Sequence, residues 1–359
     1  MSGLKQLKSR MNTVQATMKI TSAMKMISVS KLRQSHEALM KAYPFADEIN
    51  RMVRRLVRSA TARQEELISV GSPQVVPLPM LLKGRPEEKR HLVVLITSDE
   101  GLCGQFNLSL INKFEQVLDV LEKEEKKISV LCFGYRGGEI LKKKYPTLNI
   151  HIAAKRVDKN MPLFLEAERL STTLMDSFYR GAFDICTIIY SEFETAANQK
   201  IKVEQLVPLQ TFFHENKWQK LIDSADPFYV KRDVLGQKHL RMQETRLFGA
   251  IGGRNIKSPL GAIDSDNLLK MSTRQPEAYD YDGGDIKILE RILPYYMEYY
   301  IYKILLDTTA SESASRMIAM ENASKSAGDM MTQLSKKYHR KRQELVTKDL
   351  TEVVAGAES

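Results

Sequence analysis

The C-terminal stretch SESASRMIAMENASKSAGDMMTQLSKKYHRKRQELVTKDLTEVVAGAES, residues 311–359, decides the fold. It contains no proline, and one row of its residues repeats at alternating spacings of three and four. Such a repeat predicts a long helix that pairs with a second helix along this row, called the seam below. The seam is rich in Met, Ala and Ser, which allows close approach but specifies packing loosely. Its members are Met317, Met320, Ser324, Ala327, Met331, Leu334, Tyr338, Lys341 and Leu345.

A matching seam lies at the other end of the chain. After Met18 the apolar residues are Ile20, Met24 and Ile27, which predicts that this seam shifts its register. Helices that leave one domain at neighbouring points can pair side by side, so we expect an antiparallel coiled coil. The N-terminal seam residues are Leu4, Leu7, Met11, Val14 and Met18.

The N-terminal helix is strongly cationic, since Glu37 is the only acidic residue before Asp47. A basic amphipathic N-terminus also resembles a mitochondrial presequence, but the predicted helix begins at Leu4 and continues far beyond a cleavable length. We expect Pro44 to bend or break this helix, because proline removes one backbone donor and clashes with the preceding turn. Apolar periodicity then resumes and carries the helix to about Leu67.

Strands and helices alternate in the middle of the chain. Apolar runs predict strands at 91–97, 128–134, 148–153, 184–192 and 200–209, with helices at 108–126, 137–144 and 162–179. This alternation predicts a Rossmann-like α/β domain with a mostly parallel sheet. The expected organisation is a coiled-coil helix at 1–69, a linker at 70–90, the α/β domain at 91–209, an irregular insertion at 210–284 and a coiled-coil helix at 285–359.

Composition and spacing point to a binding protein. The net charge of +10 indicates an acidic partner, which nucleic acid, an anionic membrane or an acidic protein surface would each provide. The three cysteines, Cys103, Cys132 and Cys186, lack metal-type spacing and suggest a reducing compartment. No catalytic residue, metal or cofactor is predicted, and the histidines show no ligand spacing either: His36, His91, His151, His214, His239 and His339.

The loop SDEGLCGQFN, residues 98–107, follows the first predicted strand, where a doubly wound sheet binds ligands. It matches neither GxGxxG nor the GxxxxGK phosphate loop, and it contains no Lys or Arg to hold a phosphate. We therefore expect a tight turn in which Gly101 and Gly104 take unusual backbone angles. The tyrosine-rich stretch at 294–304 is interpreted as packing against a neighbouring element and not as base stacking.

The C-terminal helix carries two further candidate sites. The run KKYHRKRQ, residues 336–343, spreads its charge around a helix, which favours a charged ring over a one-sided face for DNA. A solvated run of charge is the plain alternative. Beyond it the helix becomes slim and apolar, and such a tip should be enclosed by another molecule. The tip residues are Leu345, Val346, Leu350, Val353 and Val354.

Four blocks, in order along the chain, resemble the γ subunit of F-type ATP synthases. The N-terminal block surrounds KITSAMKM at 19–26, and TSDEGLCGQFN at 97–107 is similar to the family's DRGLCGxxN turn. SESASRMIAMENAS at 311–324 resembles the SE-x-x-ARM-x-AM segment, and VTKDLTEVVAGA at 346–357 resembles the terminal signature, with Asp349 in place of the usual Glu. The resemblance covers most of the chain.

This resemblance implies a central rotor shaft that couples ion-driven rotation to conformational change in the catalytic β subunits, without catalysis of its own. It implies contact of Met24, Lys25, Arg342 and Gln343 with β, and an apolar bearing for residues 350–357. The implied partners are the α3β3 hexamer, the ε subunit (δ in mitochondria) and the c-ring, with membrane association only through Fo and no nucleic acid. The expected location is the cytoplasmic face of a bacterial inner membrane, or the matrix face of the mitochondrial one.

Two alternatives stay open from the residues themselves. A basic coiled-coil protein that binds nucleic acid would share the charge and the helices, although such proteins rarely end in an apolar slim tip. An enzyme acting on a nucleotide in the α/β domain is the third possibility. The insertion at 210–284 contains no cysteine pair for thiol control, and we expect it to add contacts at the foot of the rotor.

Overall fold

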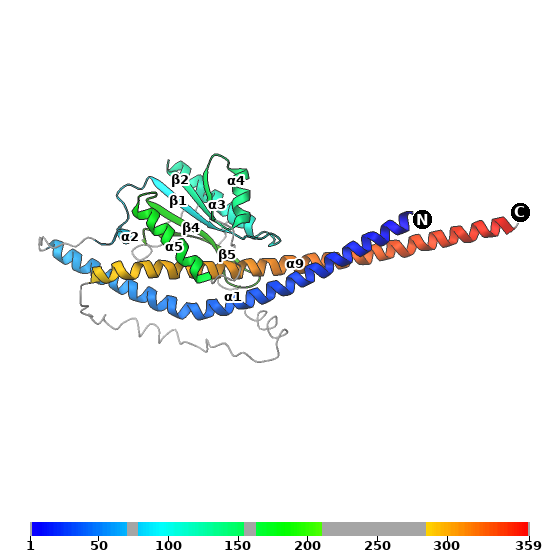
Figure 1. Ribbon diagram of the computed structural model, residues 1–359, viewed down its shortest axis with the longest axis horizontal. Coiled ribbons are helices and arrows are strands. Elements are labelled where there is room, and N and C mark those ends of the chain that lie inside the picture. Colours follow the sequence, from blue (N-terminus) through cyan, green and yellow to red (C-terminus); the bar gives the residue numbers. More distant parts are fainter. Residues whose placement is uncertain (1, 70–77, 154–162, 210–284, 358–359) are drawn as a thin grey trace, which may run out of the picture. The chain divides into compact units, whose positions relative to one another are not determined.

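The computed structural model describes residues 2–69, 78–153, 163–209 and 285–357. The insertion expected at 210–284, with His214 and His239, lies outside the described residues. Two helices far longer than the others run side by side, and an α/β region lies against them (Figure 1). The elements in chain order are α1 (Ser2–Ser69), α2 (Met80–Lys83), β1 (Arg90–Ile96), α3 (Phe106–Lys123), β2 (Lys127–Phe133), α4 (Tyr135–Lys144), β3 (Asn149–Ile152), α5 (Leu163–Tyr179), β4 (Ile185–Phe193), β5 (Gln199–Val207) and α9 (Asp285–Ala357).

The sheet confirms the predicted mostly parallel α/β arrangement. Its strand order is β3-β2-β1-β4-β5. The pairs β1 with β2, β1 with β4 and β2 with β3 are parallel, whereas β5 returns antiparallel to β4. The strand order reverses between β1 and β4, so the carboxyl ends of these strands mark the place where doubly wound sheets bind ligands.

Both long helices continue through an internal proline. Pro44 lies inside α1 and Pro294 inside α9, and each helix is a single element. The helix is therefore not broken at Pro44, and Figure 1 shows that α1 curves gently along its length. At a rise of about 1.5 Å per residue, the 73 residues of α9 make a rod of about 110 Å.

The antiparallel coiled coil is formed as predicted. Leu39 packs with Leu306, Leu32 packs with Ala314, and Lys25 pairs with Glu321. Each step of seven residues back along α1 is therefore matched by seven or eight residues forward along α9. The N-terminal seam residues are all half-buried, whereas the residues between them are exposed. The half-buried seam residues are Leu4, Leu7, Met11, Val14 and Met18.

The predicted shift of the seam after Met18 is wrong. Thr21 and Ser28 are 8% and 2% exposed and keep the original spacing, whereas Ile20 and Ile27 are 60% and 58% exposed. The hydroxyl of Thr21 donates to the Met18 carbonyl, and that of Ser28 donates to the Met24 carbonyl. Because α1 itself satisfies these hydroxyls, two slim polar residues can sit between the helices while the isoleucines face outward.

The main core lies where α1 and α9 pass the sheet. Val53 and Val57 of α1 and Leu293 and Met297 of α9 are 1% exposed or less and share one cluster with the sheet residue Ile188. The segment predicted as a linker also contributes, because Leu81 and Leu82 of α2 are buried in this cluster.

The tyrosine-rich stretch at 294–304 packs against neighbouring elements, as predicted. Tyr296 is 5% exposed and stacks on Tyr300 with ring centroids 5.7 Å apart. The hydroxyl of Tyr300 donates to Glu204 on β5, and that of Tyr299 donates to the carbonyl of Ala42 on α1. These contacts join α9 to both the sheet and α1.

Candidate functional site

The free end of α9 is the first candidate surface. Figure 1 shows that α9 continues past the N-terminal end of α1. Leu345 is half-buried, but Val346, Leu350 and Val353 are 49%, 61% and 70% exposed. These side chains carry the predicted apolar tip, and the side chain of Val354 lies outside the described residues. A solvent-exposed apolar tip of this kind calls for an enclosing partner.

The basic run below the tip is an exposed collar, residues 336–343. Arg340 and Lys341 reach Glu344 at 3.5 and 3.1 Å, so part of its charge is balanced within α9. Arg342 and Gln343 are exposed, and within the described part of the chain the guanidinium of Arg342 has no carboxylate partner. Arg342 is therefore available for an acidic surface elsewhere.

Met24 and Lys25 lie in the N-terminal half of α1. Both are half-buried. The Nζ atom of Lys25 is 2.8 Å from Oε1 of Glu321 on α9, and the two side chains are 36% and 56% exposed. Lys25 thus occupies the seam, and the structure shows its ammonium group engaged between the two helices.

The outer side of α1 in this stretch carries three exposed apolar residues. Ile20, Met26 and Ile27 are 60%, 71% and 58% exposed. The sequence alone assigned Ile20 and Ile27 to the interior, so their exposure is known only from the structure. The missed signal is the unbroken spacing of Thr21, Lys25 and Ser28, which a search for apolar residues overlooks.

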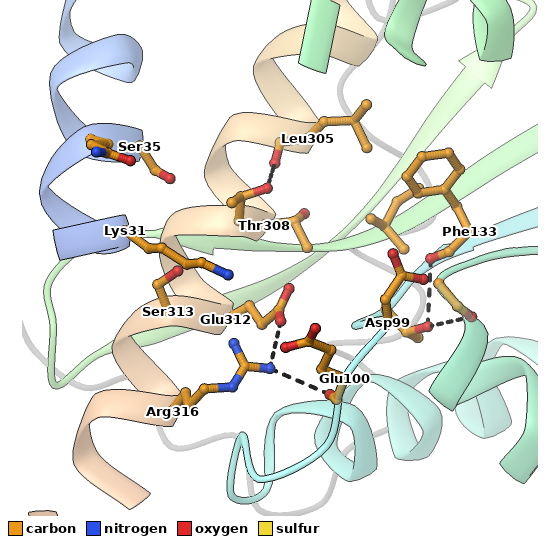
Figure 2. Close-up of a pocket in the computed structure, with 15 residues that line it drawn as sticks. Lys31, Ser35, Asp99, Glu100, Phe133, Leu305, Thr308, Glu312, Ser313 and Arg316 are labelled. Carbon is orange, nitrogen blue, oxygen red and sulfur yellow. Dashed lines mark hydrogen bonds and ion pairs between the residues drawn. The ribbon is translucent and has the colours of Figure 1, made fainter. Parts of the chain in front are cut away.

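A second site joins α9 to the loop at 98–107, called the docking loop below (Figure 2). Arg316 is 7% exposed, and its guanidinium donates to the carbonyls of Glu100 and Gly101 at 3.4 and 3.3 Å. The same group pairs with Glu312 at 2.7 Å. Burial raises the pKa of Glu312, and the charge of Arg316 opposes this effect. Two sequence blocks far apart in the chain therefore form one buried junction.

The docking loop is a tight turn, but only one of the two predicted glycines explains it. Gly104 has φ +61°, and the other left-handed position is Leu102 with φ 62°. Gly101 is not left-handed, so that part of the prediction is wrong. The loop is closed by Asn107, which accepts from the Ser98 amide at 3.1 Å and donates to the Ser98 hydroxyl at 2.7 Å.

The carboxyl edge of the sheet leaves little room for a nucleotide. A Cβ atom on Gly134 would lie 2.3 Å from the Thr97 carbonyl oxygen, so the turn after β2 presses directly on the end of β1. On the other side, α9 crosses the edge and Ser311 donates to the Ser191 carbonyl at 3.2 Å. The remaining cavity is about 250 Å³, and its lining includes Glu312, Arg316 and the acidic residues of the docking loop (Figure 2).

That cavity is smaller than the usual range for ligand pockets, about 300–1,000 Å³. Asp99, Glu100 and Glu312 on its wall oppose a phosphate and outnumber the cations Lys31 and Arg316, and Arg316 is already bound to Glu312 and to backbone carbonyls. The geometry therefore offers no support for the nucleotide enzyme considered from the sequence.

Among the described residues, the buried histidine and cysteines are enclosed by the core. His91 is 1% exposed, its Nε2 lies 2.9 Å from the Thr187 hydroxyl, and burial lowers its pKa to about 3. Burial raises the pKa of Cys132 to about 11 and that of Cys186 further. His36 and Phe193 form an edge-to-face ring pair 5.8 Å apart. Across the described ranges no cluster of three or more His, Cys, Asp or Glu side chains forms a metal site.

Asp307 on α9 is a fully buried acid that sequence reasoning missed. It is 0% exposed, and neither carboxylate oxygen has a hydrogen-bond partner of normal geometry among the described residues. Burial raises its pKa to about 7, and Glu192 adds to this effect, while Lys303 and the Phe193 amide favour the charged form. A buried acid inside a helix gives no sequence signal, because its surroundings come from β4 and β5.

No helix in the described ranges is long and apolar enough to cross a membrane. Together, the long antiparallel coiled coil, the exposed end of α9 and the docked α/β domain define the class of protein: a two-helix shaft with an α/β domain at its side.

Comparison with known proteins gives the particular family. The sequence matches the ATP synthase family over residues 3–359. It is 32% identical to the ATP synthase gamma chain of Rhodospirillum rubrum and 31% identical to that of Parvibaculum lavamentivorans, over 100% of both chains in each case. The fold is similar to the rotor of the Euglena gracilis mitochondrial ATP synthase, at 15% identity and a TM-score of 0.52, with 96% of this chain and 99% of that chain covered.

The chain therefore belongs to the γ-chain family of ATP synthase. The resemblance of the four sequence blocks and the predicted combination of α/β domain and coiled coil are confirmed. The comparisons give no support to the nucleic-acid-binding alternative.

Proposed function

We propose that this γ chain is the rotating shaft of its ATP synthase and that it transmits torque by contact, without bond chemistry of its own. The shaft is the coiled coil of α1 and α9. The observation that carries the proposal is the solitary end of α9, which bears exposed apolar residues above an exposed basic collar. A slim apolar rod end fits a sleeve inside a ring of subunits, and a charged ring below it fits acidic groups at the rim.

The tip would be held by the α3β3 hexamer. Burying an apolar side chain fully contributes about 1.5–3 kcal/mol, so enclosing the half-exposed side chains of Val346, Leu350 and Val353 would stabilise the complex by a few kcal/mol. Apolar contacts are non-directional, and a smooth apolar bearing therefore opposes rotation less than fixed ion pairs would.

The collar would contact the β subunits. Arg342 is exposed and uncommitted among the described residues, and Gln343 lies beside it. A charge-assisted contact between a guanidinium and a carboxylate is strong, yet it reverses when the partner moves away. We assign Arg342 and Gln343 to this contact.

Met24 and Lys25 would form a second contact with β. Met24 is half-buried and lies beside the exposed Ile20 and Ile27, four positions before it and three after it on the helix, so these three can meet one partner. The ammonium group of Lys25 has three donors, and its bond to Glu321 leaves others for an acidic group of β.

The other end of the molecule would face the membrane sector. We propose that the α/β domain and the neighbouring part of the shaft bind the ε subunit (δ in mitochondria) and the c-ring, and that the membrane is met only through Fo. The full-length bacterial relatives favour the cytoplasmic face of the inner membrane. The insertion at 210–284 is assigned to added contacts at this foot.

Reconstitution tests the proposal. The chain is mixed with α and β subunits, and we expect a stable complex that survives gel filtration and hydrolyses ATP. A tip variant with Val346→Asp and Leu350→Asp should assemble poorly, because it places two charges in an apolar sleeve, whereas Lys142→Asp, an exposed change on α4 outside the proposed contacts with α3β3, should assemble. Failure of the unsubstituted chain to bind α and β, with salt-sensitive binding to duplex DNA, would contradict the proposal.

A further inference from the structure

The interior of the coiled coil is polar over one stretch of α1. Between Met18 and Leu32 the seam positions are Thr21, Lys25 and Ser28, and the first and last of these are 8% and 2% exposed. Around them the helices pack through the half-buried Met18 and the buried Leu32. Apolar packing alone therefore does not account for the register in this stretch.

A more apolar seam lies one residue earlier. Ile20, Met24 and Ile27 repeat at spacings of four and three, one position before Thr21, Lys25 and Ser28. One residue on an α-helix corresponds to a rotation of about 100°. A rotation of this stretch of α1 about its own axis would therefore exchange the polar seam for the apolar one, and burial of apolar surface would favour that exchange.

The ion pair between Lys25 and Glu321 opposes this exchange. It joins the two helices at 2.8 Å from the middle of the polar seam, with the side chain of Lys25 half-buried between them. The same rotation would turn Lys25 away from α9 and leave Glu321 without this partner. A single polar residue in a coiled-coil seam specifies register in this way, even where it adds little stability.

We propose that the Lys25–Glu321 ion pair is a register-setting contact that holds α1 in the observed rotation and keeps Ile20 and Ile27 on the outside of the shaft. The use of that outer surface for the enclosing subunits rests on the proposed function. The register itself is a property of this chain and is tested without any partner.

Cysteine accessibility reports the register. In the full-length chain, Ile27→Cys and Ser28→Cys are each labelled with a soluble maleimide, and the unsubstituted chain gives the background from its three buried cysteines. Since residue 27 is 58% exposed and residue 28 is 2% exposed, we expect the Ser28→Cys thiol to react at least about tenfold more slowly than the Ile27→Cys thiol.

Reversing the charge at position 25 should exchange the labelling rates of the two thiols. When Lys25→Glu is added, two carboxylates face each other, and we expect the Ile27→Cys thiol to become protected and the Ser28→Cys thiol to become reactive. The double variant Lys25→Glu with Glu321→Lys restores the opposite charges and should restore the original pattern. Lys19→Glu, a reversal on the exposed face of the same helix, is the matched control and should leave the pattern unchanged.

Two results would overturn the inference. The first is an unchanged pattern in Lys25→Glu while its helical circular dichroism is intact. The second is a double variant that is folded but keeps the disturbed pattern. If the Lys25→Glu variant unfolds, the labelling pattern of the double variant tests the inference instead. Loss of ATP-driven coupling in an assembled complex with the labelling pattern intact would count against the proposed function and not against the register.

Discussion

The guanidinium of Arg316 donates to the backbone carbonyl of Gly101 at 3.3 Å, which fastens α9 to the docking loop at the end of β1. A buried contact therefore joins the α/β domain to α9. Ser315 adds a hydrogen bond to Gln199 at the start of β5, at 2.5 Å, on the same part of α9.

Arg316→Ala should destabilise the chain by about 3 kcal/mol, because it leaves the half-buried carboxylate of Glu312 without its partner. The control is Arg340→Ala, whose side chain is 85% exposed and pairs with Glu344 at 3.5 Å. This change should cost less than about 0.5 kcal/mol. Urea unfolding of both variants measures the difference in the free energy of unfolding. Equal losses of stability would show that the buried Arg316 contributes no more than an exposed arginine.

Asp307→Asn should remove a pH dependence of stability. Burial raises the pKa of Asp307 in the folded chain to about 7 from an ordinary value of 3.8. The folded chain therefore holds a proton that the unfolded chain releases between these values, so the contribution of Asp307 to stability falls as pH rises through this window. At most this amounts to about 4 kcal/mol above pH 7.

Thermal unfolding between pH 5 and 8 checks this. The unsubstituted chain should lose stability relative to Asp307→Asn as pH rises, and the control Asp329→Asn, on the exposed face of α9, should follow the unsubstituted chain. Parallel pH profiles for Asp307→Asn and the unsubstituted chain would show that the carboxyl is charged throughout.

Gly134→Ala should be far more damaging than Gly101→Ala. Gly134 has φ +119°, and an added Cβ would lie 2.3 Å from the Thr97 carbonyl oxygen, whereas a Cβ on Gly101 meets nothing within 4 Å. We expect a loss of about 3 kcal/mol or more for Gly134→Ala and less than about 1 kcal/mol for Gly101→Ala. Denaturant midpoints measure both, and the prediction fails if Gly134→Ala is tolerated as well as Gly101→Ala.

Arg342→Ala should lower the ATPase rate of the assembled complex several-fold while leaving the stability of the isolated chain within about 0.5 kcal/mol of the parent. The reason is that Arg342 is exposed and has no carboxylate partner in the described part of the chain. Arg340→Ala again serves as the control for lost charge in the collar. A matching loss of thermal stability and rate would instead make Arg342 a structural residue.

The sequence predicted the periodic parts of the fold well. The seam of α9 is an example, since Met320 and Leu334 are 4% and 9% exposed. The buried strand at 91–97 is another, and it forms the centre of the sheet. Both patterns follow directly from burial at a fixed spacing. The predicted contacts of Met24, Lys25, Arg342 and Gln343 with β stay predictions.

Three features needed the structure. Ile20 and Ile27 are apolar but exposed, because Thr21 and Ser28 take the seam positions with hydroxyls satisfied by their own helix. Asp307 and the junction of Arg316 depend on residues more than a hundred positions away, so local spacing does not reveal them. The short helix α2 arises in a proline-rich segment because Leu81 and Leu82 find a place in the core.

Rotation is the most direct test of the central claim. An α3β3 complex containing this chain is fixed to a surface through β, and a bead is attached to a cysteine introduced at the exposed Lys123 of α3. We expect the bead to turn continuously in one direction while ATP is present and to stop when ATP is exhausted. A bead that stays fixed while the same complex hydrolyses ATP would contradict the assignment of this chain as the rotating shaft.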